Sequence, residues 1–417
     1  MRILSLTASP RTLGRGSGST WDVRQSRQLP RCSIQPRACP FKGLFNSKSE
    51  DLPFKGFPPG KPYRLLLGMR EPEDPWLDVD EDDELLLEQL RQRAVHIRDR
   101  RNAVIQLVDE PLARQASWEL LHQLLAELPQ RYPHRFSVDG AVITNRLTGE
   151  AFDTAAPGVD PLEVAGRITQ EDFCLMAPGE LSYRLLGGVV CFPAHWSVLD
   201  KLGMELPEIH DPVPRWRSDA ALPAQRFLSR LSADKPFIRW NWSLSPTQEL
   251  HLSRFYSPPP SPTTAPPEDT RGIDFLQLRM ERQYFHRLSL SGCVVFTIRT
   301  YLQPLRAAVQ GRPRVAAALA GALRDLPYEH LQYKSNLQRR MPALLQMLDA
   351  VAAAAPEQGA GTASGAEAAA AAAEQAEQAM AKPVAAAAPM ASTAAPAAER
   401  PAAPEHVARR TATAAHT

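Results

Sequence analysis

The chain has 417 residues, a formal net charge of +2, and 44% hydrophobic against 23% charged residues. This near balance, with no basic stripe interleaved with aromatic residues, argues against nucleic-acid binding. No segment approaches the roughly 18 to 20 consecutive apolar residues that a bilayer span requires, so no membrane segment is predicted. The five cysteines are odd in number and lack paired metal-binding spacings, and three of them lie in apolar runs: Cys174, Cys191 and Cys293. We interpret these three as reduced core residues of an intracellular protein.

The two ends of the chain differ in composition from its middle. Residues 1–40 are rich in Arg, Ser and Thr and contain a single acid, Asp22, which is typical of a chloroplast or mitochondrial transit peptide. The alternative is an untargeted, disordered tail of a cytoplasmic protein. Residues 354–417 form a low-complexity tail of mainly Ala and Pro, with no apolar stripe that could dock. Residues 41–353 are therefore predicted to form one large domain with helical extensions at both ends.

The first part of this domain is predicted to be an extended arm followed by helices. Residues 51–76 carry six prolines with aromatic residues between them. The acidic run 78–84 then opens a helix that continues to residue 107, since acids lead and arginines follow. We interpret the acids as a solvated helix start rather than a metal site. Residues 111–128 predict a second, amphipathic helix.

The middle of the chain predicts mostly antiparallel strands joined by short turns. Two turn signals, Asp139-Gly140 and Thr148-Gly149, divide short alternating strands between residues 134 and 152. Later strands have alternating or continuous apolar patterns, and helices separate or follow them. The predicted strands are 172–176, 181–192, 237–243, 273–288 and 292–302, and the predicted helices are 161–168, 224–231, 305–323 (broken near Gly311 and Pro313) and 337–351. Residues 257–269 are a Pro-rich loop. Short turns between strands, with helices at both ends, indicate an α+β domain.

The stretch GGVVCFPAHWSVLDKLGMELPEIHDPVP, residues 187–214, concentrates candidate chemistry. Its apolar strand is stopped by Pro193, and apolar spacing predicts a short helix over 195–204. His210 follows on a segment that Pro212 and Pro214 stiffen. A single buried histidine is enough to ligate haem iron, which makes His210 and His195 candidates; the alternative for each is a structural histidine. No pair of histidines has the spacing of a helical metal site.

Several charged and aromatic residues of the later strands are also candidates. Arginines in or beside strands can clamp a carboxylate such as a haem propionate, or pair with Glu281 or Asp274. They are Arg239, Arg279, Arg282 and Arg287. Glu281 lies in the middle of a strand and needs a partner, either a protein arginine or a cationic substrate. Three tryptophans can wall a cofactor or fill the core: Trp196, Trp240 and Trp242. Common dinucleotide, phosphate, hydrolase and zincin motifs are absent.

An ordered set of short motifs resembles the haem-dependent oxidative N-demethylases over residues 63–348. The motifs are QEDFCLM (170–176), GGVVCFPAHW (187–196), KLG (201–203), IHDPVP (209–214), RWNW (239–242), LRMERQ (278–283) and VVFTIRTYLQPL (294–305). The resemblance implies a PAS-like α+β fold that binds haem b. It further implies oxygen-dependent removal of a methyl group from a small secondary amine such as dimethylamine, with release of formaldehyde. Electrons would come from NADPH through a separate flavin and iron–sulfur reductase.

The resemblance also implies roles for single residues. The histidine of IHDPVP, His210, corresponds to the axial haem ligand, whereas His195 departs from the family pattern. Glu281 would hold the substrate ammonium, Arg239 and Arg282 would contact propionates or support the site, and Trp196 would lie at the cofactor. Two alternatives stay open: a haem-based sensor, and a non-catalytic protein of the same fold.

Overall fold

The computed structural model describes residues 52–54, 62–73, 75–252, 272–334 and 337–354. The transit-peptide-like segment 1–40, the Pro-rich loop 257–269 and the tail beyond residue 354 lie outside these residues and stay predictions. Among the helices that are described, none is long and apolar enough to cross a membrane.

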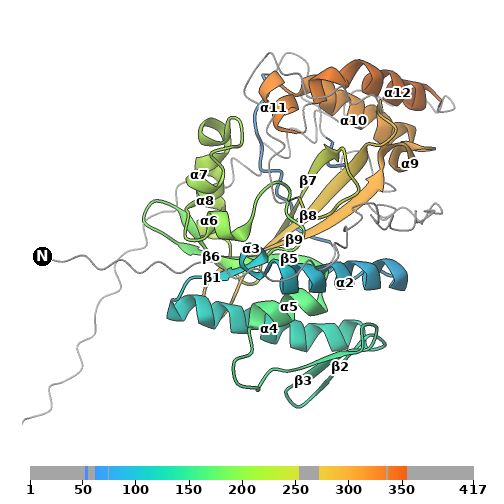
Figure 1. Ribbon diagram of the computed structural model, residues 1–417. Helices are drawn as coiled ribbons and strands as arrows, with labels where there is room; N and C mark the ends of the chain where they lie inside the picture. The colour runs from blue at the N-terminus through green and yellow to red at the C-terminus, as the bar shows by residue number, and fades with distance from the viewer. Residues whose placement is uncertain (1–51, 55–61, 74, 253–271, 335–336, 355–417) are drawn as a thin grey trace, which may run out of the picture.

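A six-stranded antiparallel sheet forms the centre of the molecule (Figure 1). Its strand order is β1-β6-β5-β9-β8-β7. The strands are β1 (Ile105–Leu107), β5 (Glu171–Pro178), β6 (Tyr183–Val189), β7 (Phe237–Ser245), β8 (Gln277–Arg287) and β9 (Val294–Pro304). A second, three-stranded sheet contains β2 (Phe136–Asp139), β3 (Val142–Asn145) and β4 (Glu150–Asp153). The predicted α+β class with antiparallel strands is confirmed.

Helices cover the large sheet in three groups, each with its own apolar cluster (Figure 1). The first group, with the small sheet beside it, is α2 (Asp83–Asp99), α3 (Arg101–Val104), α4 (Pro111–Arg131) and α5 (Pro161–Ile168). The second is α6 (Val198–Lys201), α7 (Leu206–Ile209), η2 (Trp216–Ala220) and α8 (Ala221–Arg230). The third is α9 (Leu305–Val309), α10 (Pro313–Asp325), α11 (Tyr328–Tyr333), η3 (Leu337–Arg339) and α12 (Met341–Ala353).

The two faces of strand β8 meet different groups, because successive side chains of a strand point to opposite faces. Leu278 and Met280 join the cluster of α10 and α12, and Tyr284 joins the cluster of α2, α4 and α5. Phe285 faces the other way and packs in the cluster of α8. Glu281 shares the face of Phe285, so its carboxylate lies on the same side of the sheet as α6, α7 and α8.

The predicted helix up to residue 107 was wrong at its end: the helical part ends at Val104, and the last three residues form strand β1. Ile105–Leu107 pairs with Gly187–Val189 of β6 instead of continuing the helix. Gly187 permits this pairing: its φ is +154°, and a Cβ there would lie 2.3 Å from the carbonyl oxygen of Gln106. Pairing with a distant strand overrides local helix propensity at this point.

The stretch that carries His210 also differs from its prediction. The predicted helix over 195–204 is reduced to the four residues of α6, and a further short helix, α7, follows it. Helix α7 begins with a capping box between Glu205 and Glu208, and Pro207 occupies its first turn. Pro207 therefore starts a helix where the sequence pattern suggested the end of one.

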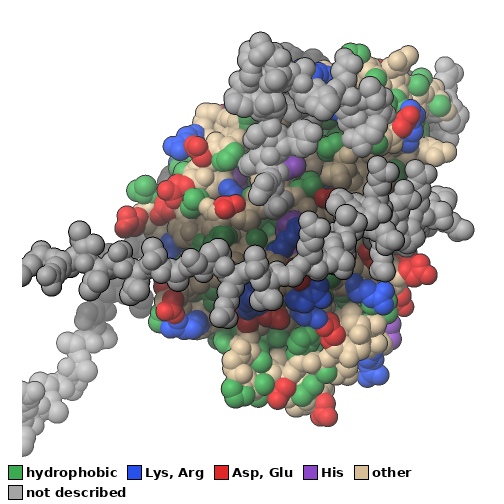
Figure 2. All heavy atoms as spheres, viewed as in Figure 1, with side chains coloured by type: hydrophobic (Ala, Val, Ile, Leu, Met, Phe, Trp, Pro, Cys, Tyr) green, Lys and Arg blue, Asp and Glu red, His purple; other side chains and the backbone are tan. Residues whose placement is uncertain are grey.

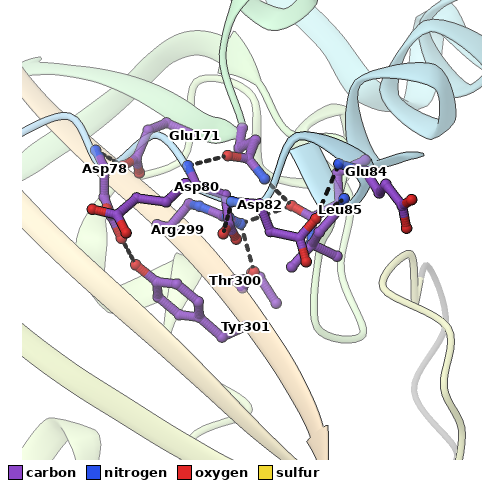
Figure 3. Close-up of polar contacts among 12 residues, drawn as sticks. Asp78, Asp80, Asp82, Glu84, Leu85, Glu171, Arg299, Thr300 and Tyr301 are labelled. Carbon is purple, nitrogen blue, oxygen red and sulfur yellow. Dashed lines mark hydrogen bonds and ion pairs between the residues drawn. The ribbon is translucent and has the colours of Figure 1, made fainter. Parts of the chain in front are cut away.

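The acidic run before α2 is more than a solvated helix start (Figure 3). Asp82 does cap α2 by accepting from the backbone N–H groups of Glu84 and Leu85. Two earlier acids instead reach the sheet: Asp78 accepts a hydrogen bond from Tyr301, and Asp80 lies 3.3 Å from the Arg299 guanidinium. These contacts fasten the segment before α2 to β9, on the face of the sheet opposite Glu281.

Glu171 is the most buried acid of this network, with 1% of its surface exposed. Its Oε1 atom accepts from the backbone N–H of Asp78 at 3.3 Å and lies 3.8 Å from Arg282, whereas its Oε2 atom is buried without a hydrogen-bond partner. Burial raises the pKa of Glu171 to about 7, against the opposing charges of Arg282 and Arg299. Between pH 4.5 and 7 the folded protein therefore holds a proton on Glu171, whereas the unfolded chain has already released it.

This raised pKa predicts a pH-dependent stability that Glu171→Gln removes. Because the pKa of Glu171 in the folded protein lies above the ordinary glutamate value of 4.5, the stabilising contribution is complete below pH 4.5 and is lost as the pH rises through 7. The free energy of unfolding of the wild type relative to Glu171→Gln should fall by on the order of 2 to 3 kcal/mol between pH 4.5 and 8. Urea unfolding of both proteins at several pH values measures it. A difference that does not change with pH would contradict the prediction.

The three cysteines within the described residues are buried and unpaired, as predicted: Cys174, Cys191 and Cys293. The face shown in Figure 2 carries basic and acidic side chains close together rather than a large area of one sign. This mixture agrees with the near-zero net charge.

Candidate functional site

His210 ends helix α7 and is held there by contacts on its ring. Its Nδ1 atom is 2.9 Å from the carbonyl oxygen of Leu206, and the ring stacks on Trp216 with centroids 3.7 Å apart and an angle of 11°. Since a carbonyl only accepts hydrogen bonds, Nδ1 carries the proton and Nε2 keeps its lone pair. No described residue forms a hydrogen bond with that Nε2 atom. Nε2 is thus available as a ligand.

The surroundings of His210 keep it uncharged. Burial lowers its pKa to about 4, the hydrogen bond to Leu206 opposes this effect, and the charges of Lys201 and Arg239 lower the pKa further. Lys201 is itself anchored by a hydrogen bond of 2.5 Å to the carbonyl oxygen of Ile209. At neutral pH the imidazole is therefore uncharged and held in one orientation, with a lone pair on Nε2. This is the form in which histidine binds a metal.

Glu281 lies in the middle of β8, opposite Asn241 on β7 and Thr300 on β9. Its carboxylate accepts from Asn241 at 3.2 Å and from Gln283 at 3.0 Å, and its other oxygen lies 3.4 Å from Arg279 Nε. Of the two partners predicted for this buried acid, a protein arginine and a cationic substrate, the structure shows the arginine, which is Arg279. A carboxylate has about four acceptor positions, so three donors leave room for one more hydrogen bond.

Two further cations lie within electrostatic reach of Glu281. Arg239 shares a face of β7 with Asn241, as predicted, and therefore lies on the same face of the sheet as Glu281; its Nε atom is buried without a hydrogen-bond partner. Lys334 follows α11 at the edge of β7, donates to the carbonyl oxygen of Trp242 at 2.5 Å and lies 4.7 Å over the ring of that residue. Neither cation has a carboxylate within 4 Å among the described residues.

The charges of these groups affect one another's pKa values. Burial lowers the pKa of Arg239 while the charge of Glu281 raises it. Burial likewise lowers the pKa of Lys334 to about 8, with Glu281 raising it and Arg239 lowering it further. Burial and then Glu281 raise the pKa of Tyr333 to about 12. The charge of Arg239 also lowers the pKa of His210, so Arg239 interacts electrostatically with both His210 and Glu281.

The site fits an anionic cofactor that contains a metal. Arg279 contacts Glu281, Arg239 and Lys334 interact with it electrostatically, and these two cations have no carboxylate within 4 Å among the described residues. Haem b carries two propionates and needs one axial nitrogen, which His210 can supply. Within the described residues no group of three or more His, Cys, Asp or Glu could hold a metal ion by itself. The donor set therefore suits a haem rather than a metal ion held only by side chains.

The structure separates the other predicted site residues. Arg282 points to the face opposite Glu281, where it donates to the backbone carbonyls of Pro75 and Trp76. It is 3% exposed and holds the segment before α2, so the structure does not bring it together with Glu281, beside which it was predicted to contact propionates or support the site. Trp196 is partly buried against the cluster that contains Trp216, near the His210 helix.

His195 lies in the turn before α6. Its φ is +68°, and its backbone N–H donates to the carbonyl oxygen of Leu252 at 2.5 Å. The backbone of His195, through its conformation and this hydrogen bond, therefore helps to form the turn.

Three residues near the candidate site were not predicted from the sequence: Lys334, Tyr333 and Trp216. Lys334 and Tyr333 lie at the end of a short helix that was not predicted, and their spacing gives no sign that they reach β7. Trp216 follows the IHDPVP motif by two residues, so its proximity to His210 in the chain was a usable signal.

A neutral histidine whose Nε2 atom has no hydrogen-bond partner among the described residues, together with the cations that interact with Glu281, is a set of groups that suits haem. The family model described as haem-dependent oxidative N-demethylase, alpha subunit-like, matches residues 69–344. This match covers more than half of the chain, and the chain belongs to this family. The suspected resemblance is thereby confirmed, and with it a dependence on haem at the level of the family. The family's description as alpha subunit-like also points to a partner subunit.

Proposed function

We propose that this protein binds haem b through His210 and catalyses the oxidative N-demethylation of a small secondary amine. The observation that carries the proposal is the His210 ring, whose Nδ1 atom is engaged by Leu206 and whose Nε2 atom is free. Arg239 and Lys334 hold the propionates, and Trp196 lies at the cofactor. The charges then balance: two propionates and Glu281 offset the three cations.

The sheet topology supports the PAS-like part of the proposal. The five long strands, numbered along the chain from β5 to β9, lie in the order 2-1-5-4-3 and are antiparallel throughout. The helices α6 to α8, which carry His210, lie between the second and third of these strands. This antiparallel sheet, with helices beside it that carry the histidine, agrees with the PAS-like α+β fold that the resemblance implies.

The protein's residues contribute binding, orientation and charge, while the cofactor, when bound, supplies the oxidation by oxygen. Glu281 accepts a hydrogen bond from the substrate ammonium at its remaining acceptor position and so directs the methyl group towards the cofactor. Oxygen, two electrons and two protons convert the N-methyl group to a carbinolamine and one water. The carbinolamine loses the amine by breaking its C–N bond, and formaldehyde is released.

The electrons come from NADPH through a separate flavin and iron–sulfur reductase in this proposal. The sequence has no paired cysteine motif for an iron–sulfur cluster and no flavin-binding motif. The described cysteines are single and buried. A separate reductase also agrees with the partner subunit that the family description indicates.

Two measurements on the purified protein test this function. The absorption spectrum should show a Soret band with one histidine ligand, and aerobic incubation with dimethylamine and a reducing system should release formaldehyde in proportion to amine consumed. A Soret band without formaldehyde from any small secondary amine would favour a haem-based sensor. Absence of haem after reconstitution would favour a non-catalytic scaffold.

Lys334→Met tests the proposed propionate contact. Loss of one charge-assisted hydrogen bond should raise the rate of haem dissociation by between about tenfold and about 10²-fold, because such a bond contributes roughly 1.5 to 3 kcal/mol. Transfer of haem to apomyoglobin, followed in the Soret region, measures this rate. Lys235→Met is the matched control, since Lys235 pairs with Glu71 at 2.6 Å on the surface. Equal rates for Lys334→Met and wild type would refute the contact.

A further inference from the structure

Arg279 is tied to three different parts of the chain. It lies on β8 with 1% of its surface exposed. Its Nε atom is 3.4 Å from Glu281, Nη1 donates to the carbonyl oxygen of Leu250 at 2.9 Å, and Nη2 donates to that of Phe192 at 2.7 Å. All three nitrogens of the guanidinium are engaged. This planar fork is a geometry that an ammonium group cannot reproduce.

Phe192 is held from its other side by Asp172. The Asp172 carboxylate accepts from the backbone N–H of Cys191 at 2.7 Å and from that of Phe192 at 2.9 Å. Asp172 is in turn paired with Arg93 of α2 at 2.6 Å, and both side chains are almost fully buried. The backbone of Phe192 is thus bonded through its N–H to an anion and through its carbonyl to a cation.

These contacts connect the two parts of the proposed site. Phe192 precedes the segment 193–209, which leads through α6 and α7 to His210, while Arg279 contacts Glu281 on β8. Asp172, Arg279 and Glu281 lie on the same face of the sheet. Their arrangement therefore connects the position of the Glu281 carboxylate to the start of the segment that carries the histidine.

Stability alone gives little reason for this arrangement. Burying charged pairs costs desolvation, and apolar residues of similar size often stabilise a core as well or better. Asp172 instead satisfies two backbone donors at one point, and Arg279 satisfies two backbone acceptors and one carboxylate. Their bonds specify position, which an apolar contact would specify less well.

We infer that Arg279, supported by Asp172 through the backbone of Phe192, is a positioning residue that holds the Glu281 carboxylate in place for the amine. This role rests on the proposed function and adds two residues to it. Arg279 orients the acid that contacts the substrate, and Asp172 orients Phe192. A displacement of about 1 Å in a positioned group lowers reaction rates by as much as about 10²-fold.

A double-mutant cycle between Arg279→Lys and Glu281→Gln tests the role. In the wild-type background, Arg279→Lys should lower kcat/KM for demethylation by about 10²-fold and weaken amine binding, measured by spectral titration of the haem. In the Glu281→Gln background, the same change should alter both quantities by less than about threefold. The Soret band of each variant shows whether the haem is retained. Should Arg279→Lys fail to fold, Asp172→Asn takes its place in the cycle.

Arg282→Lys is the matched control, because Arg282 is the neighbouring buried arginine and also donates to two backbone carbonyls, but on the opposite face. Its effect should be the same in both backgrounds. Equal losses from Arg279→Lys in both backgrounds would show a merely structural role and overturn the inference. Absence of turnover by the wild type would overturn the proposed function, and this role with it.

Discussion

His210→Ala is expected to lose the haem. Because His210 is the single proposed protein ligand to the iron, its removal should lower haem affinity by at least about 100-fold, more than the loss of a residue that only supports a ligand. The truncated side chain leaves space beside Trp216, which now stacks on the imidazole. Added imidazole should enter this space and restore the Soret band. Haem content by the pyridine haemochrome method, with and without imidazole, measures both effects.

His195→Asn is the control for this experiment. His195 lies in the same stretch of sequence but has a φ of +68°, a conformation that asparagine adopts more readily than most residues. This variant should bind haem as the wild type does. If His210→Ala retained a full complement of haem with an unchanged spectrum, the assignment of His210 as ligand would be wrong.

Glu281→Gln is expected to retain haem and lose most demethylation. Glutamine keeps the size of the side chain but not the charge that holds the substrate ammonium. A hydrogen bond between charged groups contributes roughly 1.5 to 3 kcal/mol, which predicts a fall in kcat/KM of between about tenfold and about 10²-fold. The change also leaves Arg279 buried without its carboxylate, so thermal stability should fall. Formaldehyde release, the Soret spectrum and the unfolding temperature separate these effects.

Glu249→Gln, on the exposed segment after β7, serves as the control for charge alone. It should match the wild type in formaldehyde release. Glu281→Asp should give an intermediate rate, because it keeps the charge and shortens its reach by one methylene group. Wild-type activity in Glu281→Gln would remove Glu281 from the mechanism.

Elements whose signals are local were predictable from the sequence. Helix α5 has the predicted bounds, because Asp160 caps it through the N–H groups of Leu162 and Glu163 and Pro161 begins it. The alternation of β7 likewise predicted that Arg239 and Asn241 share one face. Helices α9 and α10 are separated near Gly311 and Pro313, as those residues indicated.

Contacts between distant segments were not predictable in the same way. Residues 105–107 have a helical sequence pattern but form a strand, because they pair with β6 at Gly187 to Val189. The sequence predicted that Asp78 and Asp80 are solvated. In the structure Asp78 accepts a hydrogen bond from Tyr301 and Asp80 pairs with Arg299, both on strand β9.

For the site, the sequence by itself determined the residue types and the family motifs, because a ligand histidine and a strand glutamate can be named from the chain. It also determined that Arg239 lies on one face of its strand, since side chains alternate along a strand. Only the tertiary structure decided that Arg282 faces away and that Lys334 joins the site. It also decided that Arg279 binds Glu281, Leu250 and Phe192 together. The physical reason is that burial and ion pairing depend on which segments pack against each other, and no local pattern encodes that.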